Sequence, residues 1–333
     1  MRATPSRLLA VCLGLGLLLL LALLAGLWLG TVSIGPGQFW DWLTGRLEGA
    51  PAIILGQLRL PRLLLAALVG ACLGLCGAVF QAILRNPLAE PFILGVSGGA
   101  ACGAVFSVLV GLSGLWGQSA LAFGGALGTV ALVLAIARRR GSMETSTLIL
   151  TGVMINAFFT ALIMFVISTT TDQKLHAILF WLYGDLAAAN LTKVGLLLPV
   201  TLVGGGVIFF YARHLNLLTA GSVAAASLGV AVERVKLIMF LVVSLLVGVT
   251  VSLSGLIGFV GLMVPHLVRM TLGHDHRLLL PASALFGASF LMLADTAART
   301  VISPSALPVG VVTAFLGAPF FVLLMAKRGS RWW

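Results

Sequence analysis

The stretch Gln81–Gly99, QAILRNPLAEPFILGVSGG, separates two long apolar runs of the chain. It contains Pro87 and Pro91, and each proline removes a backbone donor and clashes with the preceding turn of a helix. The residue before each proline is also driven towards an extended conformation. The sequence therefore predicts that one hydrophobic helix ends before Arg85, that a short constrained turn with polar side chains follows, and that a second hydrophobic helix begins near Ile93.

The composition indicates a protein that lies in a membrane. Of the 333 residues, 60% are hydrophobic and only 9% are charged, and the mean hydropathy is +1.15. Apolar runs of about eighteen residues or more recur along the chain, and the 40 glycines fit helices that pack closely through small residues. We expect an all-α integral membrane protein. In such a protein the turn at 85–92 is a candidate gate at a pore mouth, or an ordinary interhelical loop.

Hydropathy and helix-breaking residues predict ten spans within a single transmembrane domain that covers the chain, 1–333. A longer polar segment, 31–58, separates the first two spans. Another long segment, about 212–234, separates the sixth span from the seventh. The predicted spans are 8–30, 61–84, 93–112, 119–137, 148–168, 191–211, 235–254, 256–272, 278–297 and 308–326.

The distribution of basic residues predicts the orientation. With the N-terminus in the cytoplasm, fourteen of the 20 Lys and Arg residues fall on the cytoplasmic side, which is the positive-inside bias. An even number of spans returns the C-terminus to the cytoplasm. The net charge of +11 thus reflects topology, and we expect no nucleic-acid partner. The six basic residues on the outer side are Arg46, Arg59, Arg62, Lys174, Lys193 and Arg299.

The acidic residues and lysines exclude several kinds of chemistry. Only Asp295 of the nine acids lies inside a predicted span, and Arg299 follows four residues later, so that the two side chains can pair. Ion-coupled carriers usually need ionisable groups at mid-membrane, and their scarcity here argues against a secondary transporter. No lysine follows a glycine, so a phosphate-binding GxxxxGK[ST] loop is absent. Any ATPase that powers this protein would be a separate chain.

Two groups of residues resemble metal ligands at first sight. His274 and His276 flank Asp275 before Arg277, but alternate residues on such a loop are more typical of a solvated turn. The four cysteines fall within apolar runs without His or carboxylate neighbours, as packing residues do. We expect neither a metal site nor a cofactor.

The segment ARHLNLLTAGSVAAASLGVAVERVK, residues 212–236, differs from the other short turns because it is long and weakly polar. Gly221 and Gly229 are expected to divide it into two short helices at the membrane surface. Small side chains allow the groove of another protein to approach closely. The segment therefore suits a docking element better than a linker.

Three motifs, NPLAEP (86–91), GFVGLMVPH (258–266) and LPVGVVTAFLGAP (307–319), closely resemble the FecCD-type permeases of bacterial ABC importers for ferric siderophores, haem and cobalamin. The resemblance runs from about residue 55 to 328. It implies the type II ABC importer permease fold in the bacterial inner membrane. It also implies a homodimer with the substrate path along the subunit interface, two ATP-binding cassette subunits on the cytoplasmic side, and a periplasmic substrate-binding protein outside.

The resemblance also implies roles for individual residues. Ser222 and Val223 depart from the family, since relatives usually carry one or two acids after the glycine that matches Gly221, and this alters the expected electrostatic contact with the ATPase. Arg59 and Arg62 have an alternative role as simple interfacial anchors. The implied sites are binding-protein docking at Arg59, Arg62 and Arg299; the cytoplasmic gate at Asn86, Leu88, Thr145 and Ser146; and ATPase coupling at Gly221, Ser222, Ser227, Leu228 and Gly229.

The function implied by the resemblance is transport without bond chemistry. ATP binding and hydrolysis in the partner chains would drive alternating access in the permease, which moves a bulky metal chelate from periplasm to cytoplasm. Ferric siderophore is the family's commonest cargo, and cobalamin and haem are alternatives. A function of a different class is an ATP-independent carrier or channel, and a membrane-embedded enzyme would need clustered nucleophiles, acids or ligands that the sequence lacks.

Overall fold

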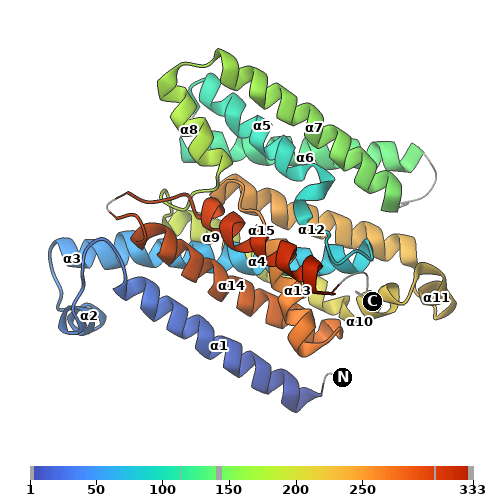
Figure 1. The fold of residues 1–333 in the computed structure, drawn as a ribbon, viewed down its shortest axis with the longest axis horizontal. Coiled ribbons are helices and arrows are strands. Elements are labelled where there is room, and N and C mark those ends of the chain that lie inside the picture. The colour runs from blue at the N-terminus through green and yellow to red at the C-terminus, as the bar shows by residue number, and fades with distance from the viewer. Residues whose placement is uncertain (1–3, 113, 140–144, 304, 329–333) are drawn as a thin grey trace.

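The computed structural model describes residues 4–112, 114–139, 145–303 and 305–328, and within these ranges the regular structure is helical. Helices α5 to α8 form one group, α4, α9 and α12 lie beside it, and α1, α13 and α14 lie beyond these (Figure 1). The helices are α1 (Pro5–Trp28), α2 (Pro36–Leu43), α3 (Ala50–Ile53), a π-helical turn (Ile54–Arg59), α4 (Leu60–Ile83), a 3₁₀ turn (Pro91–Leu94), α5 (Val96–Leu109), α6 (Leu115–Arg139), α7 (Thr145–Thr169), α8 (Asp172–Leu182), α9 (Leu191–Phe210), α10 (Ala212–Thr219), α11 (Ser222–Ser227), α12 (Val232–Ser254), α13 (Val260–Leu272), α14 (His276–Thr300) and α15 (Val309–Arg328).

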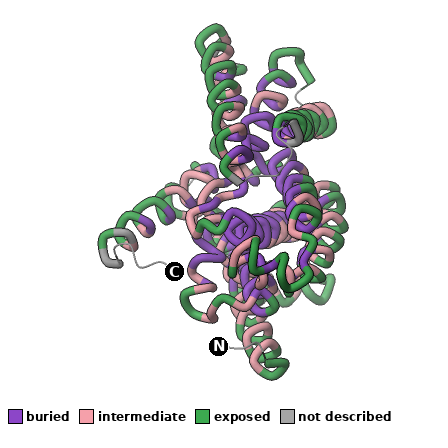
Figure 2. The backbone as a smooth tube through the Cα atoms, turned by 90° about the vertical axis from the view of Figure 1, so that its right-hand side faces the viewer, coloured by how far each residue is buried: buried purple, intermediate pink, exposed green. Residues whose placement is uncertain are grey.

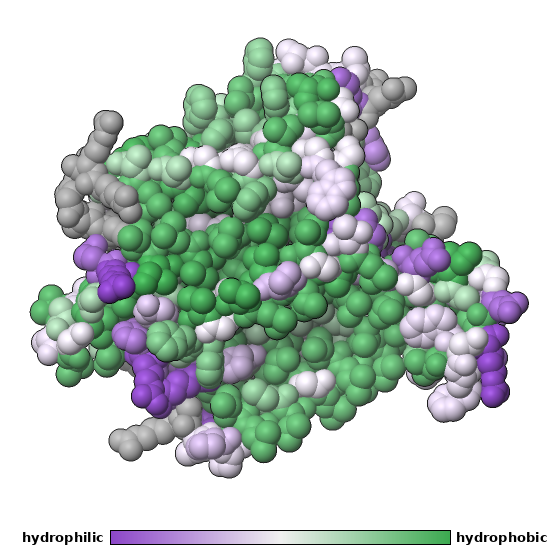
Figure 3. Space-filling model, turned by 180° about the vertical axis from the view of Figure 1, so that it is seen from behind, coloured by the Kyte–Doolittle hydropathy of each residue, from purple (hydrophilic) through white to green (hydrophobic). Residues whose placement is uncertain are grey.

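Seven of the described helices are long and apolar enough to cross a membrane, namely α1, α4 with the turns before it, α6, α7, α9, α12 and α14. Three shorter apolar helices, α5, α13 and α15, occupy the remaining predicted spans. The surface shows a broad apolar band, with the hydrophilic side chains gathered mainly at two opposite ends (Figure 3). The all-α membrane fold is therefore confirmed, while the ten-span topology stays a prediction.

The helix bounds depart from the predicted spans where the backbone is constrained. The second span begins at Ala50 rather than at 61, because α3 and the π-helical turn continue into α4 without a break. Helix α5 begins only at Val96, since the 3₁₀ turn precedes it and Gly95 has a φ of 76°. Helix α13 begins at Val260 because Phe259 has a φ of 67°, a left-handed conformation that a helix cannot contain.

Helix α4 is the centre of the molecule, and most of its residues are buried (Figure 2). It packs most extensively on α14, where a Cβ added to Gly70 would lie 2.2 Å from the carbonyl oxygen of Gly287. Only a residue without a side chain allows two backbones to come so close, and lipid supplies no hydrophobic drive that would replace this contact. The two helices therefore pack backbone against backbone.

The two ends of the apolar band carry different elements. The start of α1, the end of α15 and the short helices α10 and α11 lie at one end, and α2 and α3 lie at the other (Figure 1). This arrangement places α10 and α11 on the same side as both ends of the described chain. Which end faces the cytoplasm stays a prediction.

Candidate functional site

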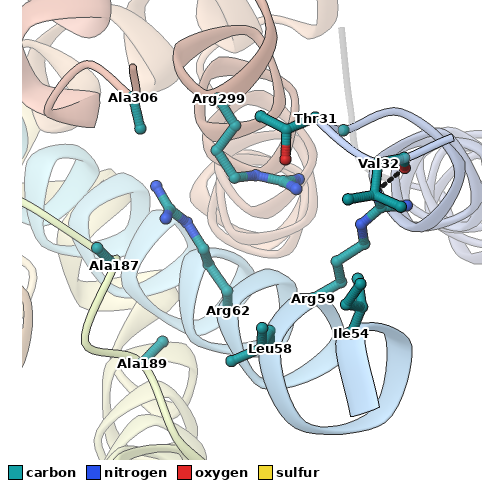
Figure 4. Close-up of a pocket in the computed structure, with 11 residues that line it drawn as sticks. Thr31, Val32, Ile54, Leu58, Arg59, Arg62, Ala187, Ala189, Arg299 and Ala306 are labelled. Atoms are coloured by element: carbon teal, nitrogen blue, oxygen red, sulfur yellow. Dashed lines mark hydrogen bonds between the residues drawn. The ribbon is translucent and has the colours of Figure 1, made fainter. Parts of the chain in front are cut away.

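At the end of the molecule that carries α2 and α3, a cavity of about 440 Å³ brings together the three arginines predicted to dock a binding protein. Arg59 and Arg62 come from the start of the long α4 run, and Arg299 comes from the end of α14 (Figure 4). The loop after α1 closes one side with Thr31 and Val32. The structure thus gathers residues that lie more than two hundred positions apart in the sequence.

Two of the three guanidinium groups share one buried carboxylate. Arg62 donates from Nε and Nη2 to Asp295 over 2.8–3.0 Å, and Arg299 donates from Nε to Asp295 Oδ2 over 3.1 Å. The Asp295 side chain is fully buried. The predicted pair of Asp295 with Arg299 is confirmed, but the bidentate partner, Arg62, was not foreseen because no local spacing connects it to α14. The fork geometry suits arginine rather than lysine.

Arg59 has a different set of partners, the backbone carbonyls at the end of α1 and in the loop that follows it. Its guanidinium donates to Leu27, Trp28 and Val32, and the side chain is buried. These carbonyls have no partner within α1, so Arg59 satisfies the end of that helix. Within the described part of the chain, Asp295 is the one carboxylate that pairs with any of the three arginines, so the cavity keeps an excess of two positive charges.

The loop predicted to form a gate has the constrained geometry that its prolines indicate. Arg85 has a φ of 49°, and the exposed Asn86 accepts a hydrogen bond from the backbone N–H of Leu88 over 2.9 Å through its Oδ1. The half-buried Leu88 thus follows an Asx turn. The structure confirms the turn, and its role as a gate stays a prediction.

Glu90 connects this loop to another motif, which the sequence did not indicate. Its Oε1 accepts a hydrogen bond of 2.8 Å from the backbone N–H of Phe259, the residue before α13. Burial raises the pKa of the Glu90 carboxyl, and the hydrogen bond from Phe259 opposes this rise. NPLAEP and GFVGLMVPH therefore meet through one side chain.

Replacing Glu90 with alanine is expected to lower the free energy of unfolding by about 1–3 kcal/mol, because the half-buried N–H of Phe259 loses its acceptor. Glu90→Gln keeps an oxygen acceptor of the same reach and is expected to cost less than about 1 kcal/mol. Unfolding in mixed micelles of the two variants measures the difference. Equal losses for both variants would mean that the hydrogen bond does not hold the loop.

The second part of the predicted gate lies at the start of α7. Ser146 is exposed in its first turn, whereas the side chain of Thr145 and residues 140–144 lie outside the described residues. Further along α7, a Cβ added to Gly152 would lie 2.6 Å from the carbonyl oxygen of Ile93. The 3₁₀ turn of the first gate loop thus packs directly on the helix that carries the second.

The predicted pair of short helices between α9 and α12 is confirmed. Helices α10 and α11 are separated at Gly221, with a φ of 120°, and Gly229 ends the second with a φ of 83°. Of the remaining coupling residues, Ser227 and Leu228 are exposed and Ser222 is half-buried, next to the exposed Val223. Two large apolar side chains at the surface of so short a helix suit contact with another protein. ATPase coupling at these positions stays a prediction.

The turn before α14 is not the solvated turn that the sequence predicted. His274 is exposed, but His276 is buried, and its backbone N–H and Nδ1 lie 2.8 and 2.7 Å from Oδ1 of Asn216 in α10. Asn216 also donates from Nδ2 to Asp275 over 2.8 Å. The prediction failed for His276 because α10 folds back over the turn. Among the described residues, no three His, Cys, Asp or Glu side chains gather as a metal site requires.

Comparisons with known proteins all point to one family. The model of the FecCD transport family matches residues 18–327. An uncharacterized ABC transporter permease protein of Bacillus subtilis, YvrB, is 46% identical over 84% of this chain and 80% of its own. The cobalamin import system permease protein BtuC of Halobacterium salinarum is 44% identical over 84% and 75%. The vitamin B12 import system permease protein BtuC of Escherichia coli is 41% identical over 95% and 94%.

Solved structures give the same picture. A transporter described as an inward-facing conformation of the metal-chelate ABC type matches with a TM-score of 0.85 and 34% identity, over 96% of this chain and 99% of its own. PsaBC from Streptococcus pneumoniae matches with a TM-score of 0.57 at 17% identity, over 86% and 95%, which is a likeness of fold alone. The arrangement of the arginine cavity and the short surface helices therefore occurs within a known permease fold.

Proposed function

Because the chain belongs to the FecCD transport family, we propose that it is the permease through which an ATP-driven importer carries a bulky metal chelate across the membrane. The chain is a multi-pass membrane protein and a transport subunit. In this proposal it performs no bond chemistry, and separate ATP-binding cassette chains hydrolyse the ATP. Directional passage comes from contacts that differ between two conformations of the permease.

The observation that supports the proposal is that two different candidate docking surfaces lie at opposite ends of the apolar band. The cavity of Arg59, Arg62 and Arg299 has a positive charge excess that suits the carboxylates of a substrate-binding protein. The exposed side chains of α11 and of the turn after it lie at the other end and suit the ATPase chains. A channel that works alone has no need of two protein-docking ends.

A second copy of the chain is proposed to cover the apolar faces of α7 and α15. Phe158 and Phe165 on α7 and Phe315 on α15 are exposed, and in a membrane such side chains face either lipid or another protein chain. A cavity of about 540 Å³ lies between Tyr183, at the end of α8, and the face of α15 that carries Phe315. A wide apolar path between two such faces suits a chelate that passes without tight binding.

The cargo is proposed to be a corrinoid of the cobalamin type. Two of the relatives, at 44% and 41% identity, are named as cobalamin or vitamin B12 permeases, and this favours cobalamin over the ferric siderophore that the family alone suggests. Ferric siderophore and haem are the alternatives. They share with cobalamin a chelated metal in a bulky molecule.

Competition for uptake distinguishes the cargoes. Proteoliposomes that hold the permease with its ATPase and binding-protein partners would be offered labelled cobalamin, ferric siderophore or haem, each alone and with an excess of the other two unlabelled. The proposal predicts ATP-dependent uptake of cobalamin that the other chelates do not reduce. Uptake of ferric siderophore alone would replace cobalamin as the proposed cargo. Uptake of none of the three would contradict the proposal that the chain imports a chelate of these three classes.

Replacing Arg62 with glutamine is expected to slow the association of the binding protein about tenfold at low ionic strength, because charged rims accelerate encounter. Glutamine is preferred to glutamate because a second carboxylate at this position would repel the buried Asp295 and disturb folding as well as docking. Stopped-flow association at two salt concentrations measures the effect. Arg46→Gln removes an exposed charge on the turn after α2 as the matched control, and equal slowing in both variants would remove the docking role from Arg62.

A further inference from the structure

Helices α4 and α14 are packed too closely to slide past each other. Besides the contact between Gly70 and Gly287, a Cβ added to Gly74 would lie 2.4 Å from the carbonyl oxygen of Ser283. Backbone carbonyls have no rotamers that would relieve such a contact, in contrast to flexible side chains. The two helices therefore move as one body, which we call the α4–α14 pair.

One end of the α4–α14 pair forms the arginine cavity. Arg62 of α4 is bound to Asp295 of α14, so that the two helices are joined there by charge as well as by packing. His276, at the other end of α14, lies roughly 28 Å away at 1.5 Å per residue. The pair thus extends from the proposed docking cavity to the surface that carries α10 and α11 (Figure 1).

At this second end Asn216 holds α10 to the first turn of α14. Its Oδ1 accepts the backbone N–H of His276 over 2.8 Å, and its Nδ2 donates to Oδ1 of Asp275 over 2.8 Å. Asp275 is the N-cap of α14 and accepts the backbone N–H of Arg277 over 3.1 Å. An amide supplies the acceptor and the donor that this cap requires, whereas a carboxylate or an aliphatic side chain supplies at most one of them.

The α4 side of the pair also approaches the short helices. Nη1 of Arg85, which follows α4, lies 3.9 Å from the position of a Cβ on Gly221, the residue that separates α10 from α11. Helix α10 packs against both α4 and α14. Asn216 differs from these packing contacts because it is a directional hydrogen-bonded link between α10 and the end of the pair.

We propose that Asn216 is a positioning residue that couples the short helices α10 and α11 to the α4–α14 pair, so that engagement of the binding protein at the arginine cavity alters ATP hydrolysis at the opposite surface. The inference rests on the proposed function, since it needs both partners. Asn216 touches neither partner in this account. It acts by holding α10 to the end of α14, so that a displacement of one helix displaces the other.

The test is the stimulation of ATPase activity by the cargo-loaded binding protein in the complete complex, reconstituted in nanodiscs. Asn216→Ala is expected to leave basal hydrolysis within about twofold of the unaltered complex and to reduce the stimulation at least about fivefold, the lower range of usual allosteric coupling. Asn190→Ala is the matched control, because Asn190 is also a capping asparagine, but its side chain accepts the N–H of Lys193 over 2.9 Å within its own helix, α9. It is expected to keep the stimulation.

A second pair of variants exchanges the amide and the carboxylate between positions 216 and 275 and so tests the hydrogen bond itself. Asn216→Asp places a second carboxylate against Asp275 and is expected to lose the stimulation. Adding Asp275→Asn restores the hydrogen bond in the opposite direction, since the new amide at position 275 would donate to the carboxylate at position 216 and asparagine is an equally good N-cap. The double variant is therefore expected to recover the stimulation, which it would not do if position 216 acted other than through its hydrogen bond to position 275.

The outcomes separate the inference from the proposed function. If the unaltered complex shows no stimulation by the loaded binding protein, the proposed function falls and the inference falls with it. If the unaltered complex is stimulated and Asn216→Ala responds as Asn190→Ala does, the inference alone is overturned. It is equally overturned if Asn216→Asp and its double variant with Asp275→Asn give the same stimulation.

Discussion

Replacement of Asp295 by alanine is expected to lower the free energy of unfolding by about 3–5 kcal/mol, because two buried guanidinium groups lose the carboxylate that they share. The side chain of Asp295 is fully buried, and those of Arg62 and Arg299 are only 11% and 10% exposed, so water in the cavity replaces the carboxylate only in part. Unfolding in mixed micelles measures the change. Asp41→Ala, on α2 at the same end of the molecule, is the control and is expected to stay within about 0.5 kcal/mol of the unaltered protein.

The same cluster allows a second comparison that tests the physical reason. Replacing Arg62, Asp295 and Arg299 together by methionine, leucine and methionine removes the charges without leaving one uncompensated, and this is expected to restore most of the lost stability. The triple variant should nevertheless lose docking of the binding protein. Asp295→Ala as stable as the unaltered protein would show that the arginines do not need their shared carboxylate.

Replacement of Gly70 by alanine is expected to lower the free energy of unfolding by about 3 kcal/mol, because the added methyl group would meet the backbone of α14 rather than a mobile side chain. A Cβ at this position lies 2.2 Å from the carbonyl oxygen of Gly287. The helices would have to separate, and this would also disturb the pairing of Arg62 with Asp295. Unfolding measurements and the association rate of the binding protein would report both effects.

The control for this prediction is Gly128→Ala in α6, where an added Cβ meets nothing within 4 Å. Alanine there is expected to be neutral or to stabilise by up to about 1 kcal/mol, since glycine is the poorer helix former. A neutral result for Gly70→Ala as well would mean that α4 and α14 are not packed as rigidly as the α4–α14 pair requires.

The sequence predicted the all-α membrane fold well because its signals are local. Long apolar runs, breakers such as Pro87 and Gly221, and charge spacing within one helix each concern residues that are close in the chain. The Asp295–Arg299 pair was found in this way, as residues four apart on one helix. The three family motifs then identified the fold as that of an ABC importer permease.

The contacts that build the site join distant segments, and no spacing encodes them. Arg62 meets Asp295 across 233 positions, and Glu90 meets Phe259 across 169 positions. Which residues meet depends on how the helices pack. Close-packing glycines such as Gly70 decide this, and the sequence does not distinguish them from the other glycines. His276 was misjudged for the same reason, because its burial comes from α10, a helix 60 residues earlier at Asn216.

The most direct measurement of the central claim is uptake of labelled cobalamin into proteoliposomes that hold the permease, its ATPase and its binding protein. The experiment compares an active ATPase with a hydrolysis-dead variant under otherwise identical conditions. If the chain is the permease of an ATP-driven importer, uptake requires ATP and disappears with the hydrolysis-dead ATPase. Uptake that continues at the same rate with the dead ATPase would contradict it and would make the chain an ATP-independent carrier or channel.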